Sequence, residues 1–455
     1  MRLKRRTTLS AWQILALGYL IVIFLGAVLL YLPFSTQKGE STSFLNALFT
    51  STSATCVTGL VPYDTNTHWT GFGQTVILCL IQLGGLGFMT FVTLLFHLLG
   101  KNMSLQNQKL FMLSSGEEKR SDTNRLFKRL LLGTLIIEGV GAILLSVRFI
   151  QDFGFFKGIY YAIFHAVSAF CNAGFDIMGG TFNNEKFVSL THYVHDPLVC
   201  ITICALIIIG GLGFCVWDDL LESKGNFKKF RLHTKIVLCS TAALLLISTL
   251  LFLLFEIKNP AFSENTFGQK LLVAFFNATT PRTAGFNTID FSTISDGSYF
   301  FMIILMFIGG SSASTAGGVK ITTLFVIIAG MFAVFSGKRD IELGKRRIHN
   351  SLLRQALDVF VSCLFMVIVA TLIICSIEAD NPVATFQAVL FETISAMGTV
   401  GLSLSLTPTL SSVSKIVLIL LMYAGRVGIL TIGLAFGEKK DVAETKKPID
   451  NVLIG

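Results

Sequence analysis

One short pattern recurs four times in this chain at nearly constant spacing. It has the form F-x-x-x-[S/T]-[A/T]-x-x-x-x-G-[L/F], and its copies read FTSTSATCVTGL, FHAVSAFCNAGF, FFNATTPRTAGF and FETISAMGTVGL. Their glycines, which lie 115, 111 and 116 residues apart, are Gly59, Gly174, Gly285 and Gly401. Four copies of one element in one polypeptide predict four similar parts around a shared axis. In a membrane, the object most often built in this way is a pore.

The composition is that of a membrane protein. Hydrophobic residues make up 53% of the chain and charged residues 14%, and the mean hydropathy is +0.71, far above that of soluble globular proteins. Eight apolar stretches are long enough to cross a bilayer, which takes roughly 20 helical residues. They lie near residues 11–32, 74–99, 130–148, 197–217, 235–255, 299–335, 357–377 and 415–436.

Basic residues are distributed unevenly along the chain, whose net charge is +9. Of the 36 Lys and Arg residues, 26 fall in five stretches: the N-terminus to Arg6, Lys101–Arg129, Lys224–Lys235, Lys338–Arg354 and the tail from Lys439. The segments that carry the four patterns hold only six. By the positive-inside rule, this predicts a multi-pass protein of the cell membrane with both termini in the cytoplasm and the patterns on the outer side. It argues against a nucleic-acid partner and fits contact with membrane lipid.

Each pattern lies between two apolar stretches, which together predict one structural unit. The apolar part before each glycine, such as Phe44–Ala54, spans only about 10–13 residues and suits a re-entrant helix. The non-helical residues that follow must be buried in protein or line a water-filled cavity. We therefore predict an all-α membrane protein with eight transmembrane helices and four re-entrant pore loops. These form four helix–pore helix–helix units in a pseudo-fourfold arrangement, with boundaries 1–100, 101–222, 223–335 and 336–455.

The residues that end at each glycine suit a path for cations. A re-entrant helix that enters from outside points its C-terminus, with roughly half a negative charge, at the membrane centre. The extended residues beyond it can turn carbonyl oxygens toward the axis and replace the water around a cation. Glycine lets the backbone approach the ion closely. The predicted filter, which would hold K⁺, consists of Val57, Thr58, Gly59, Asn172, Ala173, Gly174, Thr283, Ala284, Gly285, Thr399, Val400 and Gly401.

Ordinary outer loops with turn glycines are the alternative interpretation. Four copies in phase with an upstream phenylalanine argue against it. In the fourth copy, Thr399-Val400-Gly401 also matches the first three letters of the potassium-channel filter sequence.

The third unit contains an unusual interruption. Its second apolar stretch, Tyr299–Phe335, would be roughly 55 Å long as one helix, well beyond a bilayer core. In its middle lie ten small residues, for which close helix packing is a poor explanation: Gly309, Gly310, Ser311, Ser312, Ala313, Ser314, Thr315, Ala316, Gly317 and Gly318. We interpret them as a flexible intramembrane gating loop. Arg426 is expected to hold its carbonyls closed, while Lys320 either repels cations or extends to the cytoplasmic face.

The strings ALFTSTSATCVTGL, QLGGLGFMTF, TPRTAGFN, FIGGSSASTAGGVK and ETISAMGTVGL carry a resemblance to a known family. Over essentially its whole length the chain resembles the Trk/Ktr/HKT superfamily of potassium transporters, and most closely the membrane subunit of bacterial Ktr systems (KtrB type). The resemblance implies potassium transport, because plant members with serine at the first filter glycine prefer sodium and this chain has Gly59 there. It also implies an intramembrane gating loop in the third unit.

The resemblance further implies partners that the chain itself does not contain. These are a second copy in a homodimer and a cytosolic RCK-type regulatory ring (KtrA or KtrC type) that responds to ATP and ADP. The chain has no P-loop and no GxGxxG between a strand and a helix, so we expect no cofactor within it. The basic stretches 101–129 and 338–354 are the candidate docking surface. The transported ion would be K⁺, with Na⁺ as a candidate activator.

Several alternatives remain open at this stage. A sodium or mixed Na⁺/K⁺ transporter of the same superfamily fits the same motifs. A membrane-embedded enzyme built on Glu138 or the histidines is disfavoured, since no recognisable spacing brings polar groups together. Arg282 could satisfy loop carbonyls around the pore, which we favour, or tune ion occupancy by repulsion.

Overall fold

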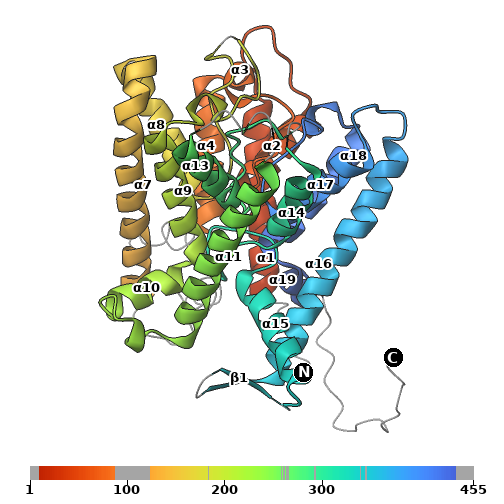
Figure 1. Cartoon of the computed structure of the whole chain (residues 1–455). Coiled ribbons are helices and arrows are strands. Elements are labelled where there is room, and N and C mark those ends of the chain that lie inside the picture. Colours follow the sequence, from red (N-terminus) through yellow and green to blue (C-terminus); the bar gives the residue numbers. More distant parts are fainter. Residues whose placement is uncertain are drawn as a thin grey trace, which may run out of the picture.

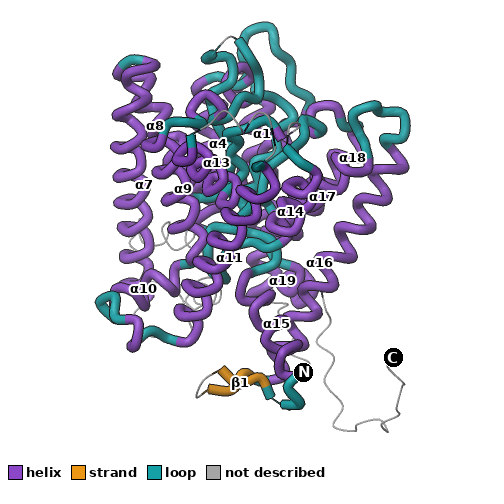
Figure 2. The backbone as a smooth tube through the Cα atoms, viewed as in Figure 1, coloured by secondary structure: helices purple, strands orange, loops and turns teal. Residues whose placement is uncertain are grey.

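The computed structural model describes residues 10–87, 123–182, 184–257, 259, 262, 266–291, 294–338, 340–343 and 346–436. This part of the chain is almost entirely helical (Figures 1 and 2). Units 1 to 4 denote the predicted segments 1–100, 101–222, 223–335 and 336–455. The tail from residue 437 and most of the first predicted docking stretch, residues 101–122, lie outside the described residues.

Each unit contributes one long helix, one short helix and one or more further helices. Unit 1 contains α1 (Ala11–Tyr31), η1 (Pro33–Ser35), α2 (Phe44–Thr55), α3 (Thr65–His68) and α4 (Gly71–Leu86). Unit 2 contains α7 (Thr123–Phe153), α8 (Phe155–Phe170), η2 (Thr191–Tyr193), α9 (Pro197–Leu212) and α10 (Phe214–Glu222). Unit 3 contains η3 (Phe227–Lys229), α11 (Leu232–Glu256), α13 (Phe267–Thr279), α14 (Asp296–Phe307) and α15 (Ile321–Phe335). Unit 4 contains β1 (Ile341–Leu343), β2 (Arg346–Ile348), α16 (Asn350–Ile377), α17 (Phe386–Gly398), η5 (Thr407–Thr409), α18 (Ser412–Val427) and α19 (Ile429–Phe436).

Four helices of the described part are long and apolar enough to cross a membrane alone. They are Trp12–Tyr31, Lys128–Phe153, Leu232–Glu256 and Asn350–Ile377, the first long helix of each unit. Two further pairs reach that length only if each bent pair counts as one span, namely α9 with α10 and α18 with α19. The described residues therefore give four to six candidate spans rather than the predicted eight.

The short helices are α2, α8, α13 and α17, of which α2 and α17 begin at a side-chain cap. Ser43 accepts a hydrogen bond from the Asn46 N–H, and Thr385 accepts one from the Ala388 N–H at 3.2 Å. In Figure 1 these helices lie in the upper half of the molecule, away from α10, α15 and the β1–β2 hairpin at the lower end. In the hairpin Ile341 pairs with Ile348 in antiparallel register.

Within the described residues the second helix ends at a glycine or breaks in every unit, which corrects the prediction that an interruption is special to the third. Units 1, 2 and 4 stop at Gly87, Gly213 and Gly428, with φ values of 85°, 94° and 86°. The pairs α9–α10 and α18–α19 bend by 90° and 91° there. Glycine adopts this left-handed conformation at no steric cost, so each of these three glycines ends its helix.

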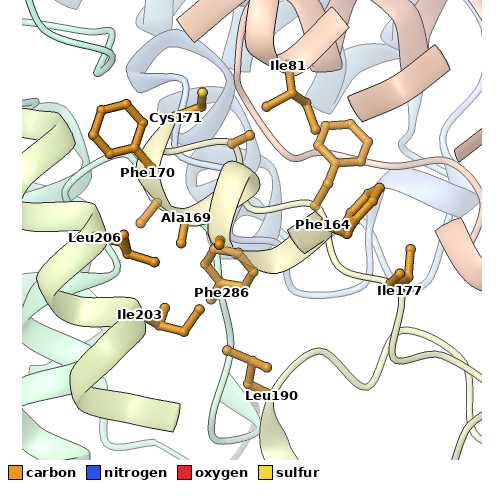
Figure 3. Packing of buried hydrophobic residues seen from close by; sticks show 14 of the residues in the cluster. Ile81, Phe164, Ala169, Phe170, Cys171, Ile177, Leu190, Ile203, Leu206 and Phe286 are labelled. Atoms are coloured by element: carbon orange, nitrogen blue, oxygen red, sulfur yellow. The ribbon is translucent and has the colours of Figure 1, made fainter. Parts of the chain in front are cut away.

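The short helices are enclosed by two clusters of buried side chains. Figure 3 shows the first around α8, where Phe286 of unit 3 lies close to Ala169 of unit 2. The second surrounds α17 and contains Phe49 and Phe391. Each fully buried phenylalanine contributes about 1.5–3 kcal/mol relative to exposure. The repeated pattern thus ties each short helix to its neighbours.

The third copy of the pattern is offset by one residue. The sequence pattern aligns Phe275 with Phe49 and Thr279 with Ser53. The structure instead buries Phe276, at 1% exposure, and leaves Phe275 half-buried. The segment from the buried phenylalanine to the glycine is therefore one residue shorter in this copy. The motif allowed either register because unit 3 has two adjacent phenylalanines and two adjacent threonines.

Candidate functional site

The four pattern glycines meet in a closed ring. A Cβ atom built on Gly59 would lie 2.5 Å from the carbonyl oxygen of Ala173 and 3.3 Å from the Cα atoms of Gly174 and Gly401. One built on Gly174 would lie 2.9 Å from the Cα of Gly285, and one on Gly285 would lie 3.3 Å from that of Gly401. Each unit therefore touches the next around the ring. No side chain fits at these positions without moving a neighbouring backbone.

The backbone conformation is the same in all four copies of the predicted filter. The glycines have φ values of 95°, 68°, 78° and 90° in chain order. The residue two places earlier is left-handed although it is not glycine; these residues are Val57, Asn172, Thr283 and Thr399, with φ between 51° and 67°. A non-glycine residue in this region costs about 1–3 kcal/mol and persists only where the surroundings impose it. Strain repeated four times in one place marks a functional backbone.

Hydroxyl groups of the short helices hold this backbone. Ser53 accepts a hydrogen bond from the Gly59 N–H at 3.1 Å, and Ser395 accepts one from the Gly401 N–H at 3.0 Å. In the other two units, Ser168 donates to the Phe175 carbonyl and Thr280 donates to the Phe286 carbonyl, both at 2.7 Å. The hydroxyl of the sequence pattern is thus a support for the ring. Sequence reasoning missed this role, although the pattern contained the signal.

The C-terminal ends of the short helices meet the second helices through glycine. A Cβ atom built on Gly84, Gly210 or Gly425 would collide with a carbonyl oxygen at the end of α2, α8 or α17. These contacts are close helix packing through small residues. Since each helix C-terminus carries a partial negative charge, the arrangement favours a cation near the ring.

A cavity of about 330 Å³ opens on the side of the ring that follows the glycines in the chain. All four glycines line it, so it leads directly to the ring. Among the described residues in its wall, Asp176 is the one with a charge. The other polar residues of the wall are Thr65, Ser189, Asn287, Ser403, Ser405 and Thr407. The cavity is therefore an oxygen-rich mouth.

On the opposite side of the ring, the chain leaves its helix between Ile308 and Lys320. Ile308 pairs with Val319 in a parallel bridge, and the Gly309 N–H donates to the Val319 carbonyl at 2.8 Å. The ten predicted gate residues form the segment between them. A Cβ atom built on Gly318 would lie 3.0 Å from the Cα of Gly398, so the segment lies directly against the end of α17.

Groups from other units fasten this segment. The Ser311 N–H donates to the Gly211 carbonyl at 2.9 Å, and the Phe214 N–H donates to the Ala313 carbonyl at 2.9 Å. The hydroxyl of Thr315 donates to the Phe170 carbonyl at 3.3 Å. These three contacts are with unit 2. Together with the contact between Gly318 and Gly398, they place the segment between unit 2 and unit 4.

Arg426 and Lys320 both donate to carbonyl oxygens of this region. The Arg426 guanidinium donates to the carbonyls of Thr315 and Gly84 and, at 3.4 Å, to that of Gly85. It thereby ties the segment to units 1 and 4. The Lys320 ammonium donates to the Ala316 carbonyl at 2.5 Å. Lys320 therefore turns back onto the segment, whereas one of the two roles considered for it was extension to the cytoplasmic face.

Comparison with known proteins decides the family. A family model described as TrkH, cation transport protein, matches residues 3–444. This chain belongs to the TrkH family. It is 41% identical to the potassium/sodium uptake protein NtpJ of Enterococcus hirae, over 100% of this chain and 99% of that protein. It is also 41% identical to the Ktr system potassium uptake protein B of Bacillus subtilis, over 97% and 96% of the two chains.

The fold is also that of a solved family member. The potassium transporter TrkH of Vibrio parahaemolyticus superposes with a TM-score of 0.73, over 96% of this chain and 86% of that one, at 18% identity. The apolar helices and the family together indicate that this TrkH-family chain is a multi-pass membrane protein. Its relatives in Enterococcus, Bacillus and Vibrio are bacterial.

Two further polar residues of this TrkH-family protein have different surroundings from those expected. The Arg282 guanidinium donates to the Thr241 hydroxyl of α11 at 3.5 Å, and no filter carbonyl in the described residues accepts from it. This contact is not one of the loop carbonyls that Arg282 was expected to satisfy. The Asn172 amide lies 3.2 Å from the Thr283 hydroxyl and links the second and third filter segments. No motif rule predicted this link.

Proposed function

We propose that this chain is the membrane subunit of a potassium-uptake system, in which K⁺ crosses through a filter of backbone carbonyl oxygens. The observation that carries the proposal is the closed ring of glycines. Carbonyl oxygens of neighbouring units, such as those of Ala173 and Ala284, lie against its glycines. Such oxygens replace the water that a cation loses on entering a membrane. Relatives named as potassium-uptake proteins support the same function.

In this proposal the transported ion passes four equivalent filter segments. Each unit supplies three residues ending at its glycine, and the C-termini of α2, α8, α13 and α17 attract the cation. Two spans per unit, eight in all, would surround the four re-entrant loops. Flow is passive, down the electrochemical gradient, because the sequence contains no nucleotide-binding motif to supply energy.

The segment Gly309–Gly318 is the proposed gate. It lies below the ring, against Gly398 and Thr399, where it obstructs the ion's exit. Arg426 keeps it there through the Thr315 carbonyl. Lys320 adds a positive charge beside the path. Opening therefore requires these contacts to be released.

The release is assigned to a cytosolic partner. Relatives bear the name Ktr system, which implies more than one component, and we propose an RCK-type ring that responds to ATP and ADP. The described part of the predicted docking surface comprises residues 123–129, 338, 340–343 and 346–354. It includes the β1–β2 hairpin, with Arg346 and Arg347 exposed. Arg347 pairs with Asp340 at 2.9 Å, so the hairpin presents an ordered charged face at the end of α15. A homodimer is proposed on the same resemblance.

A second candidate is uptake of Na⁺ or of both ions. The observation that favours it is the 41% identity to a protein named as a potassium/sodium uptake protein. Na⁺ could also act as an activator of K⁺ uptake. Ion competition separates these cases.

The test of the proposed function is rescue of a potassium-uptake-deficient bacterium at low external K⁺. The chain is expressed alone and together with a Ktr cytosolic subunit. We expect growth at low K⁺ when both are present, accompanied by K⁺ accumulation. No K⁺ accumulation despite correct membrane insertion would contradict the proposal, and accumulation of Na⁺ alone would favour the second candidate.

A further inference from the structure

An apolar groove lies at the end of unit 2 that is remote from the short helices. Its walls come from α7, α9 and α10, and α10 lies at the lower ends of the other two helices (Figure 1). The volume of the groove is about 560 Å³, within the roughly 300–1,000 Å³ typical of ligand sites. Among the described residues of its wall, Arg129 and Asp218 carry charges, and the others are aliphatic, aromatic or glycine. We call it the α10 groove.

The α10 groove opens toward the lipid. Two of its wall residues on α7, Leu132 and Ile136, are 57% and 63% exposed, and Leu221 of α10 is 67% exposed. The helix α7 contains one of the four candidate spans, so side chains exposed on it face hydrocarbon rather than water. An acyl chain of the surrounding membrane can therefore reach the groove.

The helix α10 has the position of a helix that lies along a membrane surface. The chain bends by 90° between α9 and α10, which turns α10 away from the direction of the span. Its apolar residues Phe214 and Val216 are buried against the protein, while Glu222 is exposed. Such amphipathic helices lie at the boundary between headgroups and acyl chains. The groove therefore begins where lipid headgroups end.

Two residues define the inside of the groove. The Trp217 indole N–H donates to the Ile209 carbonyl at 3.1 Å, which fixes the ring in the wall. A Cβ atom built on Gly133 would lie 3.8 Å from this ring, at ordinary contact distance. A larger side chain at Gly133 would therefore occupy the groove without displacing backbone.

The charges around the mouth of the groove favour an anionic ligand. Each acidic residue of α10 lies near an arginine: Arg129 lies 2.7 Å from Asp218. Arg231 lies 3.2 Å from Glu222 and 3.8 Å from Asp219. Exposed lysines then supply a surplus of positive charge, namely Lys128, Lys224, Lys228 and Lys229. Positive charge beside an apolar groove matches the phosphate and the acyl chain of an anionic lipid.

The walls of the groove also contact the proposed gate. The Phe214 N–H donates to the Ala313 carbonyl at 2.9 Å. The Trp217 ring packs against Phe170 at 5.5 Å between centroids, and the Phe170 carbonyl accepts from the Thr315 hydroxyl. A ligand that binds this arrangement of α10 stabilises it, and with it the present position of the proposed gate.

We propose that the α10 groove binds an acyl chain of an anionic glycerophospholipid from the cytoplasmic leaflet, with its phosphate beside the lysines around α10. The bound lipid holds α10 against the segment Gly309–Gly318. This second statement rests on the proposed function, whereas lipid binding does not. Anionic lipid should therefore lower K⁺ uptake in the absence of the cytosolic partner.

The experiment measures contact between lipid and Trp217, one of the three tryptophans of the chain. The full chain is placed in phosphatidylcholine liposomes that contain increasing amounts of phosphatidylglycerol with brominated acyl chains, which quench tryptophan fluorescence on contact. The signal of Trp217 is the difference between the wild type and Trp217→Phe, which keeps an aromatic ring in the wall. Its quenching should saturate at a low fraction of the brominated phosphatidylglycerol. Brominated phosphatidylcholine should require at least about tenfold more, since each nearby lysine favours anionic lipid roughly fivefold.

Two sets of variants test the groove and the charge separately. Gly133→Leu fills the groove and should abolish the saturable quenching. Gly139→Leu, on the same helix where nothing lies within 4 Å, should not. Removing two lysines in Lys228→Gln/Lys229→Gln should raise the phosphatidylglycerol needed by about tenfold. The matched control, Lys38→Gln/Lys186→Gln, removes two exposed lysines from the predicted outer side and should behave as the wild type.

The alternatives give different results. Equal quenching by both lipids without saturation would show contact with bulk lipid only and overturn the proposal. No quenching at all would show that a second copy or another segment of this chain covers the groove, which also overturns it.

K⁺ uptake by the same liposomes tests the link to the proposed gate. Without the cytosolic partner, phosphatidylglycerol should lower uptake about fivefold in the wild type, the lower end of usual coupling between sites. Uptake by Gly133→Leu should not depend on phosphatidylglycerol. Saturable binding with unchanged wild-type uptake would overturn the link. Absence of uptake in every lipid, with or without the partner, contradicts the proposed function instead, and the fluorescence still decides lipid binding.

Discussion

The glycine ring and the segment Ile308–Lys320 are both non-helical backbone inside an apolar protein, but they are held in different ways. Each part of the ring is supported by its own unit, as where Ser53 bonds to the Gly59 N–H and Ser395 to the Gly401 N–H. The segment has contacts of its own, such as that of Lys320 with the Ala316 carbonyl, but it also depends on groups of other units, chiefly Gly211 and Arg426. A structure that supports itself is rigid, whereas one that is held from outside can be released. This difference suits a permanent filter and a movable gate.

The two regions also differ in repetition. The four segments of the ring share one backbone conformation. In the third copy, the stretch from the buried phenylalanine to the glycine is one residue shorter. The breaks in the second helices likewise occur in all four units, at Gly87, Gly213 and Gly428 and after Phe307. Only in unit 3 does the break extend into a long segment of small residues. The proposed gate is therefore an enlarged version of a feature that all units share.

The largest effect is expected from a side chain in the ring. Gly401→Ala would place a methyl group 2.9 Å from the Cα of Gly59, in a left-handed conformation. We expect K⁺ uptake to fall to the level of an empty vector, because the neighbouring backbone must move. The control is Gly139→Ala on α7, where nothing lies within 4 Å. Normal uptake by Gly401→Ala would show that the ring is not the path.

The next effect tests the external support of the gate. Arg426→Gln removes the charged donor from the carbonyls of Thr315, Gly84 and Gly85. The segment loses the equivalent of about one hydrogen bond to a charged group. Uptake measured in the absence of the cytosolic partner should therefore rise roughly tenfold. Arg148→Gln, which breaks an ion pair with Asp196 instead, should leave it unchanged. Equal uptake by the two variants in the absence of the cytosolic partner would exclude Arg426 as the residue that holds the segment in place.

A smaller effect is expected from the internal support of the ring. Ser395→Ala leaves the Gly401 N–H without its 3.0 Å acceptor. The loss is worth about 0.5–1.5 kcal/mol, so K⁺ over Na⁺ selectivity should fall by roughly two- to tenfold. Ser376→Ala, at an exposed hydroxyl that bonds within its own helix, is the control. Ion competition assays measure the change; unchanged selectivity in Ser395→Ala would mean that the hydroxyl does not hold the ring.

The smallest effect is expected on thermal stability, from Glu378, which lies outside the ring. Glu378, at the end of α16, is desolvated, which raises its pKa, but hydrogen bonds from Ser411 and Ser414 outweigh this and lower it to about 2. Because the folded pKa is depressed, this stability is present above the unfolded value of 4.5 and is lost as pH falls toward about 2. Glu378→Gln should lower the melting temperature in detergent by a few degrees at neutral pH, with ion selectivity unchanged. Asp380→Asn should not; equal melting temperatures would contradict this role.

The sequence was sufficient for the parts that repeat. The pattern around Gly59, Gly174, Gly285 and Gly401 located the residues that meet in the ring, since each copy independently signalled a short helix and a glycine. The small-residue run located the interruption of the sixth apolar stretch. Arg426 was expected at the gate because a charge at that depth needs carbonyl partners, and it has them.

The sequence was not sufficient where long-range contacts decide. Whether Arg282 faces the ring or α11 depends on how two units pack, and motif spacing carries no information on it. Lys320 turns back to Ala316 because the segment offers a near carbonyl. The helix breaks at Gly87, Gly213 and Gly428 could have been predicted, since a glycine after a run of small residues is a common helix end.

The most direct test of the central claim is K⁺ and Na⁺ competition for uptake in Gly59→Ser. The serine Cβ would lie 2.5 Å from the Ala173 carbonyl oxygen and so disturb the ring at one of its four contacts. If the ring selects the ion, Na⁺ should compete with K⁺ far more effectively in Gly59→Ser than in the wild type and in the control Gly139→Ser. Identical competition curves in all three proteins, at equal amounts in the membrane, would contradict the assignment of the ring as the selectivity filter.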